Sequence, residues 1–156
     1  MKVIFLDFDG VITNYESRYN LNAKKMEIIK RICEVTDAKI VITSSWRFAT
    51  LEDTMISITD VSKDPNLIPF FPAECVIGVT DRMRAFKNWN TDTLFRVPRG
   101  TEIKEWLSEH KDVDRYVIID DEADILLEQA DFFVRTDEIE GITEEDAERV
   151  IQILNK

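Results

Sequence analysis

Two aspartates, Asp7 and Asp9, stand one residue apart at the end of a short apolar run, and Gly10 follows them. Two more, Asp120 and Asp121, end another apolar run far along the chain. Carboxylates that lie close together repel each other unless a cation or a proton lies among them. A set of oxygen ligands favours a hard divalent cation such as Mg²⁺. The pattern therefore predicts a magnesium site where the two runs meet.

The same residue types indicate phosphoryl transfer. An aspartate held beside a metal ion stays ionised at neutral pH and can attack phosphorus, and Asp7 is the predicted nucleophile. Asp9, two residues on and on the same side of an extended chain, is the predicted general acid and base. Thr43 and Ser44 end a third apolar run, and their hydroxyls are expected to donate hydrogen bonds to phosphoryl oxygens.

The distribution of charge limits the classes of partner. The formal net charge of −11 disfavours broad contact with nucleic acid, because such contact depends on Lys and Arg at the phosphates. The charge is uneven, however, since five basic residues and one acid lie between positions 82 and 99. The sequence therefore allows a local binding site for an anion in this segment. One cation, at Arg99 or Lys104, is expected to neutralise charge that builds in the transition state of phosphoryl transfer.

Strands and helices alternate along the chain, which predicts an α/β fold, a three-layer sandwich around a parallel sheet. Apolar runs without polar alternation, typical of strands buried on both faces, cover 2–6, 39–42 and 116–119. Weaker strand signals fall at 75–77 and 132–134. Helical spacing predicts helices over about 21–35, 51–58 and 123–129, after 99, and after the capping pair Thr143 and Asp146. Ligands of such sheets bind at the carboxyl ends of the strands, where the aspartates and hydroxyls stand.

Residues 1–156 are expected to form one domain, with the turn-rich segment at about 60–98 as a small cap or insert. The stretch from Asp9 to Thr43 is mostly helix and leaves no room for a large cap, so the site is open to large substrates. No run approaches the roughly 18 apolar residues of a membrane span, and no signal peptide is evident. We therefore expect a cytoplasmic protein without a membrane partner.

Other hydrolytic chemistries find no support in the sequence. It has one histidine, no G-x-S-x-G and no Walker A pattern, so serine hydrolase, zinc and P-loop mechanisms lack their residues. Phe86, Trp89 and Phe95 lie among the cations of the basic segment and suit base stacking. Packing onto the core is the interpretation that we favour for them.

Four motifs in order resemble those of the haloacid dehalogenase (HAD) superfamily. They are D-F-D-G-V-I-T from Asp7, V-I-T-S-S around Thr43, a basic residue before the last strand–helix unit, and I-I-D-D ending at Asp121. The resemblance implies a Rossmann-like core, Mg²⁺ and, most often, hydrolysis of phosphomonoesters. It implies Asp7 as nucleophile, Asp9 as general acid and base, and Thr43 as the phosphate-binding hydroxyl. The implied metal ligands are Asp7, a backbone carbonyl at Asp9, and Asp120 with Asp121 beside it.

Two assignments stay open within this resemblance. The third motif's cation is Arg99 or Lys104, and we slightly favour Lys104. Asp124 follows Asp120 at a spacing that some members of the superfamily use, so the acidic partner of Asp120 is undecided.

A narrower resemblance concerns the substrate. S-S-W-R at 44–47 and R-G-T-E-I-K-E-W-L at 99–107 are similar to the small HAD domains of RNA repair proteins, and Arg18 resembles an arginine of phage end-healing 3′-phosphatases. It implies a nucleotide or a nucleic-acid 3′ end as substrate, with substrate contacts from Arg18, Ser44, Arg47 and Arg99. A phosphatase of small molecules in general and a non-catalytic binding module are the alternatives. The oligomeric state is not indicated.

Overall fold

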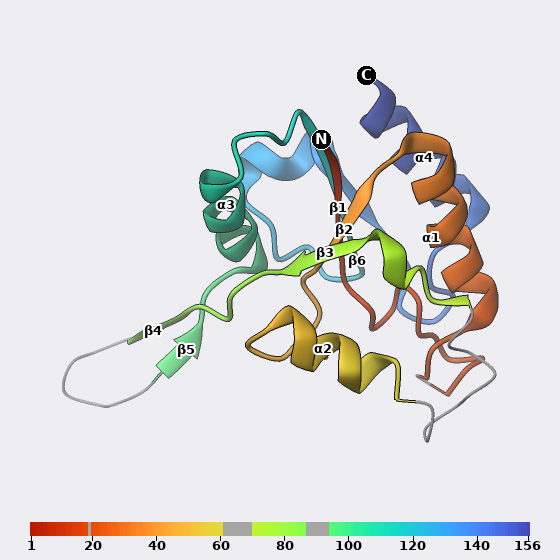
Figure 1. Ribbon diagram of the computed structural model, residues 1–156, viewed down its shortest axis with the longest axis horizontal. Coiled ribbons are helices and arrows are strands. Elements are labelled where there is room, and N and C mark those ends of the chain that lie inside the picture. Colours follow the sequence, from red (N-terminus) through yellow and green to blue (C-terminus); the bar gives the residue numbers. More distant parts are fainter. Residues whose placement is uncertain (19, 61–69, 87–93) are drawn as a thin grey trace.

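A five-stranded parallel sheet forms the centre of the computed structural model, which describes residues 1–18, 20–60, 70–86 and 94–156 (Figure 1). The strand order is β3-β2-β1-β6-β7, with β1 in the middle. The predicted strands are confirmed to within two residues. Their bounds are β1 (Lys2–Leu6), β2 (Lys39–Ile42), β3 (Val76–Val79), β6 (Arg115–Asp120) and β7 (Phe133–Arg135).

Helices cover both faces of the sheet, which confirms the three-layer sandwich (Figure 1). Alternate residues of β1 serve the two sides, because successive side chains of a strand point in opposite directions. Ile4 and Leu6 pack with α1 (Ala23–Thr36) and α4 (Glu144–Asn155). Phe5 packs with α3 (Arg99–Glu109) on the opposite face. All three β1 residues are fully buried, as the continuous apolar run predicted.

Local signals explain where several helices begin and end. Thr143 accepts from the Asp146 backbone N–H (3.2 Å), and the Asp146 carboxylate accepts from the Thr143 N–H (3.0 Å), so the predicted cap of α4 is confirmed. The Asn22 side chain caps α1 by accepting from the backbone N–H groups of Lys24 and Lys25, and Asp37 ends the helix with a left-handed backbone (φ 56°). The bounds of α2 (Leu51–Ile58) match the predicted helix, and the Thr50 side chain caps it.

The prediction of a helix over 123–129 is wrong. The structure instead has a 3₁₀ helix, η3 (Leu127–Phe132), after an irregular stretch. Gln129 explains the difference, because its side chain accepts from the Leu126 N–H (2.9 Å) and donates to the Gly100 carbonyl (2.9 Å). These bonds tie the segment to α3. Leu127, which contributed to the apolar pattern, is 92% exposed.

The predicted insert at about 60–98 is interrupted by a strand of the core. β3 lies within it and pairs with β2, directly after the 3₁₀ helix η2 (Ala73–Cys75). The strands β4 (Arg84–Phe86) and β5 (Leu94–Arg96) pair antiparallel in a separate two-stranded sheet (Figure 1). Trp89 lies outside the described residues. None of the described helices is both long and apolar enough to cross a membrane.

Candidate active site

Strand register places Asp7 between Thr43 and Asp120 at the carboxyl edge of the sheet. Leu6 pairs with the last residue of β2 on one side and with the penultimate residue of β6 on the other. The residues that follow these three, Asp7, Thr43 and Asp120, are therefore neighbours. The Thr43 N–H continues the ladder by donating to the Leu6 carbonyl (2.9 Å). Three predicted site residues thus come together because they end adjacent parallel strands.

Three carboxylates gather at this edge. Asp7, Asp120 and Asp121 each offer an oxygen, and these oxygens lie within 4.8 Å of one another. Asp7 and Asp120 are 5% and 2% exposed. Gly10 allows Asp121 to approach, because it has a φ of +67° and a Cβ built there would lie 2.6 Å from the Asp121 carboxylate. Hard oxygen donors in such proximity form a ligand set of the kind that Mg²⁺ takes.

The electrostatics of the cluster favour a cation among the aspartates. Burial raises the pKa of Asp7 and that of Asp120, and the charge of Asp7 raises the pKa of Asp120 further. The positive charge of Arg99 acts in the opposite direction on both groups. The charge of one arginine therefore does not offset the effect of burial on the pKa values of the two acids. A divalent ion among the carboxylates would favour their ionised forms.

Arg99 is the cation that the structure brings to the aspartates. Its guanidinium lies 3.9 Å from the carboxylate of Asp7 and 3.9 Å from that of Asp120, and its side chain is 5% exposed. Asp124 holds the start of α3, since its side chain accepts from the Arg99 N–H (3.0 Å). Of the two acids considered as partners of Asp120, Asp121 lies in the carboxylate cluster. Asp124 instead fixes the residue that supplies the cation.

Lys104, the cation favoured from the sequence, lies elsewhere. Its ammonium pairs with Glu128 (2.6 Å), and both side chains are more than 60% exposed. Five residues along a helix correspond to a rotation of about 140°, so Arg99 and Lys104 occupy different faces of α3. The structure therefore favours Arg99, the alternative that the sequence left open.

Thr43 and Ser44 are fully buried beside Asp7. A hydrogen bond from the Ser44 side chain lowers the pKa of Asp7 and so opposes the effect of burial. The Thr43 hydroxyl has no hydrogen-bond partner within the described part of the chain, and neither do Asp7 Oδ1 or Arg99 Nε and Nη1. Buried polar atoms without partners are rare in folded proteins. Their concentration here fits a site for a cation and an anionic group with several acceptor oxygens.

Asp9 lies beside the carboxylate cluster but is not part of it. Both of its carboxylate oxygens accept from the Trp46 indole N–H, at 3.0 and 3.1 Å. The hydroxyls of Ser45 and Thr13 lie 3.4 Å from the same carboxylate. These donors hold the Asp9 side chain, and the expected metal contact through the backbone carbonyl of Asp9 stays a prediction. Trp46 is a site residue that sequence reasoning missed, and its position directly after Ser45 was the available signal.

The guanidinium of Arg47 has no N–H group left to bind substrate. It is 2% exposed and forms a buried ion pair with Glu102 (2.6 Å). Every N–H direction of its guanidinium is used inside the protein, because it also donates to the backbone carbonyls of Thr43, Ser44, Thr80 and Asp81. The expected substrate contact is therefore corrected to a positioning contact, in which Arg47 holds the loop after β2 against the end of β3.

Arg18 forms no hydrogen bond or ion pair with the carboxylate cluster in the described part of the chain. It lies in an exposed loop with a left-handed backbone (φ 52°), and its N–H donates to the Tyr15 carbonyl (3.0 Å). Its expected role in substrate binding stays a prediction.

The parallel sheet between two helical layers, with acidic strand ends meeting at one edge, defines an α/β domain of the HAD type. The sequence matches, over residues 3–147, the family described as the HAD domain in Swiss Army Knife RNA repair proteins, and the chain belongs to this family. The matched range contains every candidate site residue named above. No curated protein matches the sequence.

Proposed function

We propose that this HAD domain is a Mg²⁺-dependent phosphatase that removes the terminal phosphate from nucleic-acid 3′ ends, RNA above all, through a phosphoryl-aspartate at Asp7. The observation that carries the proposal is the set of buried polar atoms without a hydrogen-bond partner in the described part of the chain: Asp7 Oδ1, the Thr43 hydroxyl, and Arg99 Nε and Nη1. They combine one nucleophilic oxygen with donors for phosphoryl oxygens. A phosphomonoester is the substrate that complements both.

The donor set also fits the metal. Asp7, Asp120 and Asp121 would hold Mg²⁺, which supplies positive charge against the phosphoryl oxygens when it is bound. Asp7 is buried at the end of a central strand, so its carboxylate has little freedom to leave the site. A fixed nucleophile of this kind shortens the path to an in-line attack.

In the first half-reaction, an Asp7 oxygen attacks phosphorus and the bond to the leaving 3′ oxygen breaks. Asp9 gives its proton to that oxygen, which leaves as a hydroxyl. In the second half-reaction, Asp9 takes a proton from a water molecule as the water attacks phosphorus, and the bond between phosphorus and the Asp7 oxygen breaks. The products are inorganic phosphate and free Asp7. Throughout, Thr43 and Arg99 donate hydrogen bonds to the phosphoryl oxygens as charge develops on them.

Two features support a nucleic-acid end as the substrate. The family takes its description from RNA repair proteins, so a damaged or processed RNA end is the substrate class that its context offers. In addition, the segment between β1 and β2 contains α1 as its one regular element among the described residues, so a large cap over the site is not built there. A site without a large cap in this segment is compatible with the end of a polymer.

The proposal is tested by comparing a 3′-phosphorylated oligoribonucleotide with a 3′-mononucleotide and a sugar phosphate, in Mg²⁺ and in excess chelator. We expect the oligonucleotide to be the best substrate and turnover to need Mg²⁺. Asp7→Asn should lower kcat by at least about 1000-fold, because the amide is not a nucleophile. Asp37→Asn is the matched control, since Asp37 is 98% exposed at the end of α1.

Other results would revise the proposal in defined ways. Turnover that survives Asp7→Asn, or that survives the chelator, would contradict the mechanism. Equal rates on all three substrates would identify a general phosphatase. An absence of turnover with every substrate, in a folded protein, would identify a binding module.

A further inference from the structure

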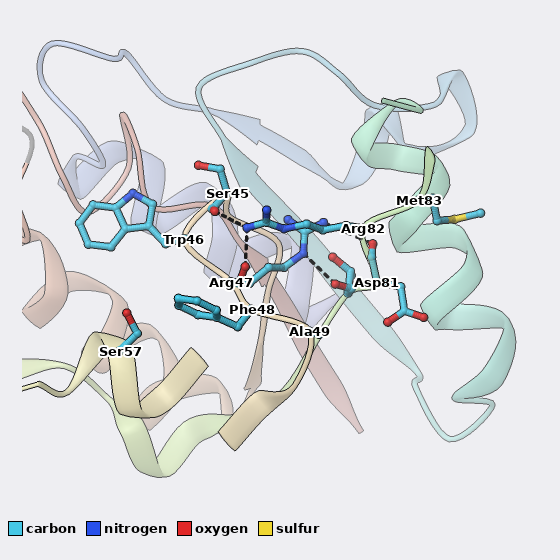
Figure 2. A pocket seen from close by; sticks show the side chains of 10 residues that line it. Ser45, Trp46, Arg47, Phe48, Ala49, Ser57, Asp81, Arg82 and Met83 are labelled. Carbon is cyan, nitrogen blue, oxygen red and sulfur yellow. Dashed lines mark hydrogen bonds between the residues drawn. The ribbon is translucent and has the colours of Figure 1, made fainter. Parts of the chain in front are cut away.

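A pocket of about 790 Å³ opens between the loop after β2 and the segment after β3, outside the carboxylate cluster (Figure 2). Ser45 and Trp46 belong to its lining, and both direct a donor at the Asp9 carboxylate, at 3.4 Å and 3.0 Å. Pockets of this volume are typical of sites for small ligands or for one unit of a polymer. The pocket therefore begins at the residues that hold the predicted general acid.

The position of Asp9 indicates which part of a substrate enters this pocket. A general acid must reach the oxygen that departs, so it lies on the side of the leaving group. In-line displacement puts the leaving group opposite the Asp7 oxygen that attacks. On the proposed function, the leaving group is the terminal nucleoside, whose 3′ oxygen carried the phosphate. The wall formed by Ser45 and Trp46 thus faces that nucleoside.

The walls of the pocket suit a nucleobase. Phe48 lines the pocket and is 53% exposed, although burial of a phenylalanine side chain stabilises a folded protein. The loop that carries it is fixed, because the Phe48 N–H donates to the Thr54 hydroxyl (2.8 Å). Figure 2 shows the rings of Trp46 and Phe48 on the side of the pocket away from Met83. A flat apolar face held in place is the feature on which bases stack.

Positive charge lies in the same wall. Arg82 donates to the carbonyls of Ser45 and Arg47 through one nitrogen, Nη2, and remains exposed. This holds its guanidinium at the pocket (Figure 2). The lining also holds the exposed acid Asp81, so Arg82 offers one local position for an anionic group beside the exposed ring.

We propose that this pocket binds the terminal nucleoside of a 3′-phosphorylated RNA, with the base stacked on Phe48 and the adjoining phosphodiester near Arg82. The assignment rests on the proposed function and adds to it a place for the base. It makes the enzyme sensitive to the presence of a terminal base, while the identity of the base matters little, because every base offers a face for stacking.

The test compares two oligonucleotides that differ in one group. Both carry a 3′-phosphate, and one has an abasic terminal sugar in place of the last nucleoside. We expect wild-type kcat/KM to be about 5- to 100-fold higher with the base present. Phe48→Ala should bring this ratio close to one, and Phe48→Trp should restore it. Val35→Ala, at a 60% exposed position of α1, is the matched control and should keep the wild-type ratio.

A second measurement separates failure of this assignment from failure of the proposed function. Acetyl phosphate has no ring that could stack. Its Mg²⁺-dependent hydrolysis by the wild type therefore reports on the phosphatase chemistry alone. If acetyl phosphate and oligonucleotides are all left intact, the proposed function fails. If the chemistry works and the base makes no difference, or Phe48→Ala keeps the wild-type ratio, the pocket assignment is overturned. Faster turnover of a phosphoserine peptide than of the oligonucleotide would overturn it as well.

Discussion

The guanidinium of Arg99 lies 3.9 Å from the carboxylate of Asp7, and both side chains are more than nine-tenths buried. Two guanidinium nitrogens, Nε and Nη1, have no hydrogen-bond partner in the described part of the chain. Arg99 is thus near enough to the nucleophile to influence it, yet retains N–H groups for another ligand. This arrangement suits a residue that donates hydrogen bonds to the phosphoryl oxygens during phosphoryl transfer.

We expect Arg99→Ala to lower kcat/KM for a phosphomonoester by about 100- to 1000-fold, because it removes donors aimed at developing charge. Lys104→Ala is the matched control. It removes a cation from the same helix, but one that pairs with Glu128 at the surface, and should change kcat/KM by less than about twofold. Steady-state kinetics on one substrate measures both. A larger loss in Lys104→Ala than in Arg99→Ala would reverse the assignment.

Gly10→Ala is expected to weaken Mg²⁺ binding by about 10- to 100-fold, because the new methyl group would displace the Asp121 carboxylate that it meets at 2.6 Å. The positive φ of Gly10 adds backbone strain. Titration calorimetry with Mg²⁺ measures the effect. Gly78→Ala provides the control, since its Cβ would make an ordinary 3.5 Å contact with Trp106. Unchanged Mg²⁺ affinity in Gly10→Ala would count against Asp121 as a ligand.

Trp46→Phe should impair the reaction most where the leaving group needs a proton. The substitution keeps an aromatic ring against Phe8 and removes the N–H that holds Asp9. We expect turnover of an alkyl phosphate to fall about tenfold, with a smaller effect on p-nitrophenyl phosphate, whose leaving group departs without protonation. Trp106→Phe, in the core between α3 and the sheet, is the control. Equal losses on the two substrates would show that Trp46 does not act through Asp9.

Breaking the ion pair between Arg47 and Glu102 is expected to lower the free energy of unfolding by about 3–5 kcal/mol. Arg47→Ala removes a buried charge partner and leaves backbone carbonyls without their donor. Urea unfolding measures the loss. Lys104→Met breaks the ion pair between Lys104 and Glu128, in which both side chains are exposed. It should lower the free energy of unfolding by less than about 1 kcal/mol. Similar losses in the two variants would contradict the structural role given to Arg47.

The sequence was sufficient for the sheet and for the residues at its edge. Continuous apolar runs locate buried parallel strands, and parallel strands bring their carboxyl ends together, so the meeting of Asp7, Thr43 and Asp120 followed from pattern alone. The capping pair of α4 was equally direct, because its residues lie three positions apart and interact locally. Local chemistry and strand order account for these successes.

Tertiary contacts decided what the sequence left undetermined. Arg99 reaches the site because Asp124 and Gln129, from a segment some 25 residues later, fix the first turn of α3. Arg47 resembles a substrate-binding arginine in sequence, yet carbonyls of its own loop and of the segment after β3, with the Glu102 carboxylate, take up its donors. Neither outcome is encoded in a local pattern. For the same reason, the 3₁₀ helix after Leu126 took the place of a predicted α-helix.

The most direct test of the central claim is to trap the phosphorylated protein. A 3′-phosphorylated oligonucleotide is mixed with the enzyme and Mg²⁺, quenched in acid within the first turnover, and the digested chain is examined by mass spectrometry. We expect a phosphoryl group on Asp7 that appears and decays as fast as product forms, and none in Asp7→Asn. Full turnover with no phosphoryl group on Asp7 at any time would contradict the account.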